Sequence, residues 1–584
     1  MLKISFIIWS YCNIHLVVGP QVVMDFTKSP VGELKRFWDS TGFCPPLPRS
    51  STARFMLSPD VLFNLALIGS IPNKAISQVR IHWLLDIITV SINESGVPHY
   101  NFTSLDQLLD WMHFFNLNPG FEIMGNPSEY FSNFSDNRQV LKWRQMIQQI
   151  ASRYIDRYGL PIISRWRFET WNEPDLKSYN IFNFTFQRGP AGLFKAPEKH
   201  PLCWGLLEYC SNSTTCPLDF ISFHKKGGGS SKAILEQDLE LALNISRRYP
   251  TLQGISLVND EADPLTGWSK AEPWRADVRY AAMVASVIIS HQQVMVGKYG
   301  LPLELLSNDN AFLNYHPFYF NQRTLLARFQ MNNTNPSHIQ FFKKPVYTMM
   351  SLLSLLGTQE LNVTILDPDS RFQSLASTEY IYGAWSNTVL LVFSNDTIAG
   401  PDDILSVTLK MLNLRKIYRY VLYLMDNSVT NPENVWVKAG SPVFPTKEQR
   451  AQIRASEGPY RARGPKNVPH TGKLRLKMSL KLPKVAQVSR VMVCNITYNE
   501  VMLFWSDVLV LTRCMKTYEV EFRPLNRTEF KRINIDDTIL LSFQYSVTAE
   551  EEQVTGWYRV RAVDYWNRRG RYSTPVKYHG EKCS

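Results

Sequence analysis

Two kinds of hydrophobic pattern alternate along the chain between about residues 30 and 356. Short apolar runs of strand length, such as SQVRIHWLL and GISLVNDEAD, are followed by longer stretches in which apolar residues recur every three or four positions. One such stretch, VLKWRQMIQQIASRYIDRY, precedes Gly159, which is a helix stop signal. Repeated strand–helix units predict a parallel sheet. A closed (β/α)8 barrel of the TIM type is expected, since no G-x-G-x-x-G follows the first strand to suggest a dinucleotide-binding sheet.

After Leu356 the pattern changes to short alternating runs, such as VLLVFSN and YRYVLYLMD, joined by polar turns. This alternation predicts an antiparallel β-sandwich over residues 357–488. Residues 489–584 read as a smaller all-β unit, in which GWYRVRAVDYWNRRGRYSTPV resembles the closing strands of a fibronectin type III domain. The expected fold class is therefore a multidomain α/β and β protein, with a barrel over residues 30–356 followed by two β domains.

The spacing of the predicted strands indicates that the barrel is shortened near its middle. Only 88 residues separate Glu173 from Glu261. The three strand–helix units expected in that interval usually need about 30 residues each or more. No convincing fifth strand is present between residues 180 and 202. We therefore expect a shortened strand-five region, in which each buried backbone group without a partner costs about 1–3 kcal/mol.

Several features indicate that the chain enters the secretory pathway. Residues 1–22 carry Lys3 and then an apolar run, which is typical of a secretory signal. The eight cysteines show no metal-binding spacing, and Cys494 and Cys514 flank two strand-like runs and are expected to form a disulfide. Eleven N-x-S/T sequons, which matter only in that pathway, lie at Asn93, Asn101, Asn133, Asn183, Asn212, Asn244, Asn332, Asn362, Asn395, Asn495 and Asn526. Of these we expect Asn101 and Asn332 to be glycosylated.

Charge and composition narrow the range of partners. The net charge of +12 favours acidic partners, namely nucleic acid, anionic membrane or sulfated polysaccharide. Much of this charge lies in residues 461–484, a stretch that by itself is more typical of a solvated loop and strand. No later stretch reaches 18 uninterrupted apolar residues, so membrane insertion is not expected. The oligomeric state is not indicated by the sequence.

Polar side chains follow nearly every predicted strand of the barrel. In a (β/α)8 barrel the functional side chains lie at the C-terminal ends of the strands. A purely structural face would not need so many ionisable groups in one place. The residues at these ends are His82, Asn172, Glu173, His224, Lys226, Glu261, Asp263 and Asp309.

Two of these residues have the surroundings that glycoside hydrolysis requires. Glu173 and Glu261 each follow an apolar strand and a polar neighbour and then meet a proline, in NEP and NDEADP. Glycosidases place two carboxylates on either side of the bond that they break. Glu169 lies four residues before Glu173 inside the strand, and we expect it to support the site by pairing with an arginine or lysine. Asp263 is expected to orient Glu261 or a lysine.

The motifs STGFCPPLP, RIHWLL, FETWNEPD, SFHKKG, NDEADPLTGW and LLSNDNAFLNYHP together resemble glycoside hydrolase family 39, and in particular its lysosomal members. The resemblance extends from about residue 34 to the C-terminus. It implies that Glu173 is the acid/base and Glu261 the nucleophile, and that a glycan at Asn332 lies near the active site. It also implies substrate contacts from Pro45, Leu47, His82, Asn172, Lys226, Gly267, Asp309 and Arg323.

The function implied by this resemblance is that of a retaining exo-glycosidase. It would remove terminal α-L-iduronic acid from dermatan sulfate and heparan sulfate in the lysosome, with no cofactor, metal ion or nucleic acid. Lys226 and Arg323 suit this substrate, because a uronic acid carries a carboxylate that needs cationic partners. Against the family pattern, about two dozen residues are missing after Gln187, and Arg49 replaces a histidine in CPPLPRS.

Two alternatives stay open at this point. A β-xylosidase-like glycosidase would use the same two glutamates, although a neutral pentose offers Lys226 and Arg323 no anion. A catalytically silent isoform that binds glycosaminoglycans would fit the basic charge and the incomplete barrel.

Overall fold

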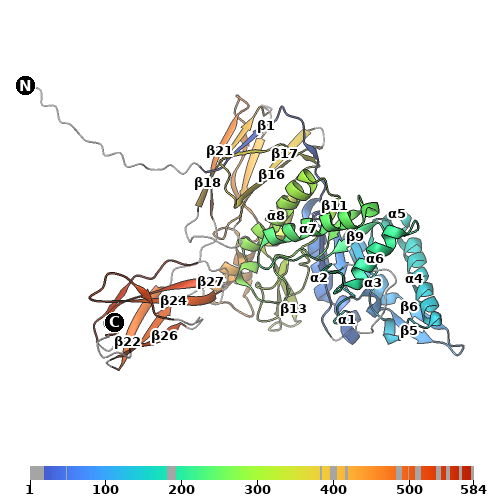
Figure 1. Cartoon of the computed structure of the whole chain (residues 1–584), viewed down its shortest axis with the longest axis horizontal. Coiled ribbons are helices and arrows are strands. Elements are labelled where there is room, and N and C mark those ends of the chain that lie inside the picture. The colour runs from blue at the N-terminus through green and yellow to red at the C-terminus, as the bar shows by residue number, and fades with distance from the viewer. Residues whose placement is uncertain are drawn as a thin grey trace, which may run out of the picture.

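A computed structural model of the chain shows a helix-flanked barrel unit, a two-sheet β unit above it and a third, separate β unit (Figure 1). In Figure 1 the barrel helices α2 to α7 lie on the right, β16, β17, β18 and β21 at the top, and β22 to β27 at the lower left. The described residues are 19–47, 49–179, 192–216, 218–381, 384–394, 404–414, 419–481, 489–497, 499–506, 515–534, 541–547, 553–564 and 569–580.

The barrel unit contains two groups of parallel strands. The first has the order β3-β4-β7-β8, and the second has the order β11-β10-β9. The first group comprises β3 (Ser40–Phe43), β4 (Gln78–Ile81), β7 (Asn118–Glu122) and β8 (Arg167–Glu169). The second comprises β9 (Phe220–Phe223), β10 (Ser256–Asn259) and β11 (Leu303–Leu306).

Backbone hydrogen bonds connect the two groups well at one edge and poorly at the other. Next to β3, the backbone N–H of Leu306 donates to Phe37 O (2.7 Å), and that of Ala311 donates to Gly42 O (2.9 Å). Between β8 and β9, Gly192 supplies one parallel bridge to Phe223. Among the described residues the barrel thus has seven strands and is not closed between β8 and β9. This corrects the expectation of a closed eight-stranded barrel and agrees with the predicted shortening of the strand-five region.

Helices cover the outside of the barrel and follow the predicted pattern. The helix α4 (Asn137–Tyr158) begins after Asp136, whose side chain accepts from the Arg138 N–H, and ends at Gly159, which has a φ of 84°. The helix α8 (Val278–His291) follows Pro273, and its inner face is almost wholly apolar. The other barrel helices are α1 (Thr52–Met56), α2 (Pro59–Gly69), α3 (Thr103–Phe114), α5 (Leu160–Ile163), α6 (Pro201–Asn212), α7 (Ser231–Arg248) and α9 (Pro345–Leu353).

The second unit consists of two four-stranded sheets that enclose their own apolar core. Their orders are β15-β1-β18-β21 and β17-β16-β14-β2. The first sheet contains β15 (Thr364–Leu366), β1 (Gln21–Asp25), β18 (Ile404–Leu412) and β21 (Leu474–Lys481). The second contains β17 (Ala384–Phe393), β16 (Phe372–Ile381), β14 (Gln359–Glu360) and β2 (Gly32–Glu33).

The predicted domain boundaries need correction at both ends of the barrel. The strand β1 overlaps the end of the predicted 1–22 signal segment and pairs in parallel with β18, so residues before the barrel belong to the second unit. The helices α10 (Pro432–Lys438) and α11 (Lys447–Ala455) lie within the predicted 357–488 sandwich but pack on the barrel unit. There Ile453 is buried with Phe329 of β12 (Leu326–Met331) and Phe342 of β13 (His338–Lys343).

The third unit begins at β22 (Ser489–Thr497) and has sheets of three and four strands around one core. Their orders are β22-β23-β26 and β25-β24-β27-β28. Cys494 of β22 is disulfide-bonded, whereas Cys514 lies outside the described residues, so their predicted pairing stays a prediction. The remaining strands are β23 (Glu500–Ser506), β24 (Met515–Pro524), β25 (Lys531–Arg532), β26 (Ser542–Ser546), β27 (Gly556–Asp564) and β28 (Val576–Tyr578). In the part of the chain described, no helix has the length and apolar character needed to cross a membrane.

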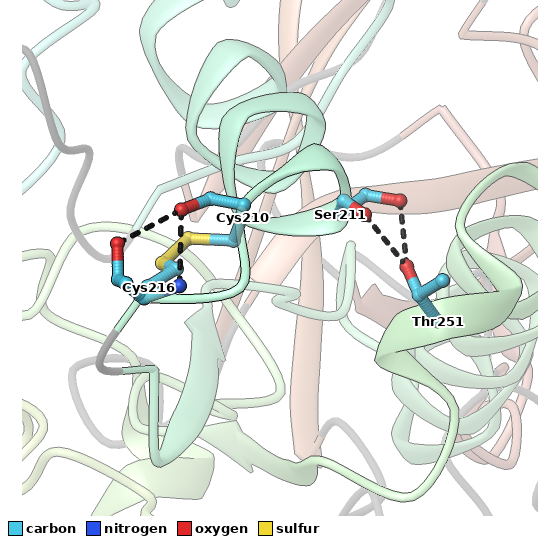
Figure 2. The surroundings of a disulfide bond; sticks show 6 residues. Cys210, Ser211, Cys216 and Thr251 are labelled. Atoms are coloured by element: carbon cyan, nitrogen blue, oxygen red, sulfur yellow. Dashed lines mark hydrogen bonds between the residues drawn. A yellow bond between two sulfur atoms is a disulfide. The ribbon is translucent and has the colours of Figure 1, made fainter.

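A disulfide that was not predicted closes the loop after α6. Cys210 in the last turn of the helix bonds to Cys216, six residues later (Figure 2). Beside it, the hydroxyls of Ser211 and Thr251 are 2.7 Å apart, and Thr251 Oγ1 also donates to Ser211 O (3.1 Å). These contacts fix the end of α6 near the incomplete edge of the barrel, where few strand hydrogen bonds are available.

Removing this disulfide in a C210A/C216A variant is expected to loosen the C-terminal half of α6. A covalent loop of this size contributes about 2 kcal/mol by restricting the unfolded chain. Hydrogen exchange measured by mass spectrometry should therefore show faster exchange for residues 206–212, with an opening free energy lower by about 2 kcal/mol. Exchange in α3 serves as the internal control and should not change. Identical exchange of α6 in both proteins would show that the disulfide carries no local stability.

Candidate active site

The barrel interior is organised around one buried arginine. Arg80 lies on β4 between Val79 and Ile81, and its side chain is 1% exposed. Its guanidinium donates to Asn172 Oδ1 (2.9 Å). It also faces four carboxylates, at 2.6 Å from Glu122, 3.0 Å from Glu169, 3.0 Å from Asp260 and 3.1 Å from Glu261. The ends of β4, β7, β8 and β10 are thereby tied to a single cation.

Glu261 follows β10 and is surrounded by positive charge. Its Oε1 is 3.1 Å from Arg80 Nη1, and its Oε2 accepts from Lys226 Nζ. The imidazole of His224 lies 3.6 Å from Oε1. Burial alone would raise the pKa of Glu261, but His224, Lys226 and Arg80 outweigh it and hold the pKa well below its usual value. Glu261 is therefore a carboxylate even in acidic solution.

Glu173 follows β8 and faces Glu261 across His224. Its backbone has a φ of 40°, in the left-handed region, which directs the side chain away from the strand. His224 Nδ1 is hydrogen-bonded to Glu173 Oε1 (2.6 Å), and its Nε2 lies 3.0 Å from Asp260 Oδ1. One side-chain atom from each of Glu173, His224 and Glu261 lies within 4.8 Å of the other two. The predicted pair of carboxylates thus meets in one site, despite the short segment that joins them.

The carboxylates around His224 favour its charged form. Burial lowers the pKa of His224, but the negative charges of Glu261 and Asp260 outweigh it and raise the pKa to about 10. The pKa of Glu169 is also raised, which for a carboxyl group favours the neutral form. Burial and the nearby charges of Asp260 and Glu122 raise its pKa well above the usual value in spite of Arg80.

Polar atoms without a partner also face this site. Asn172 uses Oδ1 for Arg80, while its Nδ2 is buried and has no hydrogen-bond partner among the described residues. Asp309, which follows β11, accepts from Arg323 Nη2 through Oδ2 (2.7 Å). Within the same described part of the chain, Asp309 Oδ1 and Arg323 Nε and Nη1 lack a hydrogen-bond partner. These atoms can bind the hydroxyl or carboxylate groups of a ligand.

The other predicted contact residues lie around this centre. His82 donates from Nδ1 to Glu122 (2.8 Å), and its Nε2 is 3.7 Å from Glu261. Pro45 is buried beside Cys44, whose thiol pKa is raised by burial and by the charge of Glu122. Leu47 is 81% exposed, and no described contact joins it to the two glutamates.

Gly267 is connected to Asp263 by another arginine, Arg275. Arg275 donates from Nη1 to Gly267 O (2.8 Å), and its Nη2 lies 3.2 Å from Asp263 Oδ2. Asp263 also accepts from Tyr280 (2.9 Å), so the expectation that it orients Glu261 or a lysine is wrong. Arg49, the departure noted in CPPLPRS, stacks on Trp83 with its guanidinium carbon 3.3 Å from the ring centre.

The structure confirms one predicted supporting residue of the site and shows three more that the sequence analysis did not identify. Glu169 pairs with Arg80, as expected of a carboxylate inside the barrel. Arg80, Glu122 and Asp260 were not singled out. Arg80 could have been found because it lies two residues before His82 and so shares its inward-facing side of the strand.

Within the described ranges, two clusters have the ligand types of a metal site, although their surroundings differ. In the first, formed by Glu173, His224 and Glu261, Lys226 and Arg80 already balance the charge of Glu261. The second consists of Asp175, His200 and Cys203. There Asp175 accepts from the backbone N–H groups of Leu202 (3.0 Å) and Cys203 (3.2 Å) at the start of α6. Its carboxylate thus has a structural role as a helix cap.

Both predicted sites of glycosylation are accessible. Asn101 ends β6 (Pro98–Asn101) and is exposed, and its Oδ1 accepts from the backbone N–H of Thr103 (3.0 Å). Asn332 is exposed immediately after β12. Their modification stays a prediction.

Comparison with known proteins gives consistent matches over almost the whole chain. The family model described as "Glycosyl hydrolases family 39" matches residues 22–475, and that of the "Alpha-L-iduronidase C-terminal domain" matches residues 489–580. The α-L-iduronidase of Mus musculus is 41% identical, over 96% of this chain and 97% of its own length. That of Homo sapiens is 40% identical, over 96% and 94%. The solved structure of a bacterial orthologue of human α-L-iduronidase is 25% identical, with a TM-score of 0.67 over 96% of this chain and 99% of its own.

Replacing Arg80 with glutamine is expected to destabilise the barrel strongly. Removing one partner of a buried ion pair costs about 3–5 kcal/mol, and here four carboxylates lose their shared cation. Urea denaturation should show this loss in the free energy of unfolding. The matched control is Arg157→Gln on α4, which pairs with Asp110 with both side chains about 40% exposed (38% and 41%), so its loss should stay below about 1 kcal/mol. Equal effects of the two substitutions would contradict the central role of Arg80.

The charge on His224 predicts a pH dependence of stability. Its pKa is about 10 in the folded protein and about 6.5 in an unfolded chain. Its stabilising contribution is therefore complete below pH 6.5 and is lost as the pH rises through 10, with a slope of up to about 1.4 kcal/mol per pH unit. Denaturation at a series of pH values should show this slope in the unmodified protein and a smaller one in His224→Gln. His99→Gln, at an exposed position, should retain the original slope, and equal slopes in all three proteins would exclude a charged His224.

Proposed function

The chain belongs to glycosyl hydrolase family 39, and we propose that it removes terminal α-L-iduronic acid from dermatan sulfate and heparan sulfate with retention of configuration. The observation that carries this proposal is the approach of Glu173 and Glu261, which bring a side-chain oxygen each to within 4.8 Å of the other. Retaining glycosidases hold their carboxyl groups about 5–5.5 Å apart, whereas inverting ones need about 6.5–9.5 Å to admit a water molecule.

In the first step Glu261 acts as the nucleophile. One of its oxygens forms a bond to the anomeric carbon while the glycosidic bond breaks, and Glu173 gives a proton to the departing oxygen. The lowered pKa of Glu261 supports this role, because the nucleophile must be ionised in an acidic compartment. Lys226 and Arg80 hold its carboxylate in position.

In the second step the glycosyl-enzyme ester is hydrolysed. Glu173, now a carboxylate, takes a proton from water, the water oxygen bonds to the anomeric carbon, and Glu261 leaves as a carboxylate. His224 contacts Glu173 at 2.6 Å and lies 3.6 Å from Glu261, so it can stabilise whichever of the two carries negative charge. The atoms and protons balance, because the proton lost by water replaces the one that Glu173 gave to the leaving group.

The free polar atoms support recognition of a uronic acid. Arg323 Nε has no hydrogen-bond partner among the described residues, and Lys226 donates one of its three protons to Glu261, so both can bind the carboxylate of the sugar. Asn172 Nδ2 is suited to the 2-hydroxyl, where hydrogen bonds strengthen in the transition state, and Asp309 Oδ1 is suited to another hydroxyl. These buried cations disfavour the β-xylosidase-like alternative.

A lysosomal location reached through the secretory pathway is part of the proposal. The exposed sequons at Asn101 and Asn332 and the disulfide Cys210–Cys216 support passage through an oxidising compartment. The substrate is a sulfated glycosaminoglycan, and no cofactor is invoked in either step. The silent, binding-only alternative is disfavoured because both carboxylates and their cations are in place.

A fluorogenic α-L-iduronide assay at acidic pH tests the residue roles. Glu261→Gln is expected to lose at least about a thousandfold in kcat, because the covalent step then has no nucleophile. Glu173→Gln should lose about a hundredfold or more, mainly in the step that needs a base. Glu208→Gln on the exposed face of α6 is the matched control and should be fully active. Activity retained by Glu261→Gln, or faster hydrolysis of the corresponding xyloside, would reject the proposal.

A further inference from the structure

The most basic stretch of the chain has no part in the active site. Residues 461–484 contain eight lysines or arginines and no aspartate or glutamate. They form β20 (Tyr460–Asn467), which pairs with β19 (Arg419–Leu424), and then β21, at the edge of the sheet of the second unit. This stretch explains much of the net charge of the chain.

Lys473, just before β21, and Arg475 and Lys477 within it lie on one side of the strand. Lys473, Arg475 and Lys477 are exposed, whereas Leu474 and Leu476 between them are buried in the core. Alternate residues of a strand lie about 7 Å apart on the same face. The three side chains therefore form a row of positive charges along the edge of the sheet.

Two cations of β20, Arg461 and Arg463, extend the positive charge of this row. Arg461 and Arg463 are exposed and alternate in the same way. Arg463 and Lys477 line one cavity of about 490 Å³ between α8 and the second unit, so the two strands bring their charges to the same region. We call Arg461, Arg463, Lys473, Arg475 and Lys477 the basic face. The cavity itself has a largely aliphatic lining, which places the polar contacts at its rim and on the exposed strands.

The basic face is not balanced by the rest of the described chain. None of its five cations has an ion pair with a described carboxylate, although surface charges of both signs are usually interspersed. Arg475 lies directly opposite Lys410 of β18, and like charges in this position destabilise a sheet. Lys410 donates to the neutral amide of Gln21 (2.6 Å), which leaves its charge uncompensated. Such a row is electrostatically complementary to a linear polyanion.

We propose that the basic face binds the sulfated polysaccharide at a second site, separate from the two catalytic glutamates. This inference rests on the proposed function, which supplies a linear chain bearing sulfate and carboxylate groups as the substrate. Holding one part of a chain raises the effective concentration of its end at the active site. The basic face would then lower KM for long chains and leave the turnover of a small iduronide unchanged.

The test uses the full-length protein with Arg463, Arg475 and Lys477 all replaced by glutamine. The control variant carries glutamine at Lys232, Lys298 and Lys447, which are exposed elsewhere and give the same change in net charge. Binding of a size-defined heparin oligosaccharide is measured by calorimetry or fluorescence over a series of salt concentrations. The basic-face variant should bind at least about tenfold more weakly at low salt. Its slope of log affinity against log salt should fall by about two to three, since each cation that meets an anion releases about one counterion.

Kinetics separate this proposal from the proposed function. For the basic-face variant, kcat/KM on a heparan sulfate-derived chain should fall through KM, while kcat/KM on the fluorogenic iduronide should match that of the control variant. If the unmodified protein binds heparin but does not hydrolyse the small iduronide, the proposed function fails and the binding site stands. Equal heparin affinity in both variants would overturn the binding site. Equally strong, salt-dependent loss of binding to a DNA duplex would overturn its assignment to sulfated saccharides.

Discussion

The whole arrangement of the active site depends on the charge of Arg80. The ends of three strands, β7, β8 and β10, bring four acidic side chains into the buried interior, and gathering that much negative charge without a cation would be strongly unfavourable. Arg80 solves this by offering a planar group with several donors, which a lysine could not do in the same geometry. The pKa of Glu261 is lowered by His224, Lys226 and Arg80 together, whereas burial and the charges of Asp260 and Glu122 raise the pKa of Glu169 in spite of Arg80.

The residues that could be predicted from the sequence are those whose role follows from the local sequence pattern. The helix α4 and its stop at Gly159 follow from periodicity and from the freedom of glycine at a positive φ. Glu173 and Glu261 follow from their position after a strand, because the topology of parallel units brings all such ends to one side. Leu47, Pro45 and Gly267 came only from the resemblance to a family, and their direct contacts with substrate are still predictions.

The parts that could not be predicted are those made by long-range pairing. Arg80 looks like an ordinary charged residue in a strand until Glu122, Glu169 and Asp260 are seen around it. The strand β1 is five residues long and lies next to a signal-like segment, so nothing in its local pattern indicates that it pairs with β18. The incomplete edge between β8 and β9 was expected from the short interval between Glu173 and Glu261, since strand–helix units usually need about 30 residues each, and from the residues missing against the family pattern.

The position of β1 has a consequence for biosynthesis. Gln21 and Lys410, to which it is hydrogen-bonded, are 389 positions apart in the chain. At about 5–20 residues per second, roughly 20 to 80 seconds pass between the translation of the two. During that time the barrel can begin to fold, while β1 still lacks its partner β18. The first sheet of the second unit can thus be completed only after the barrel has been synthesised, when β18 and β21 pair with a strand made long before them.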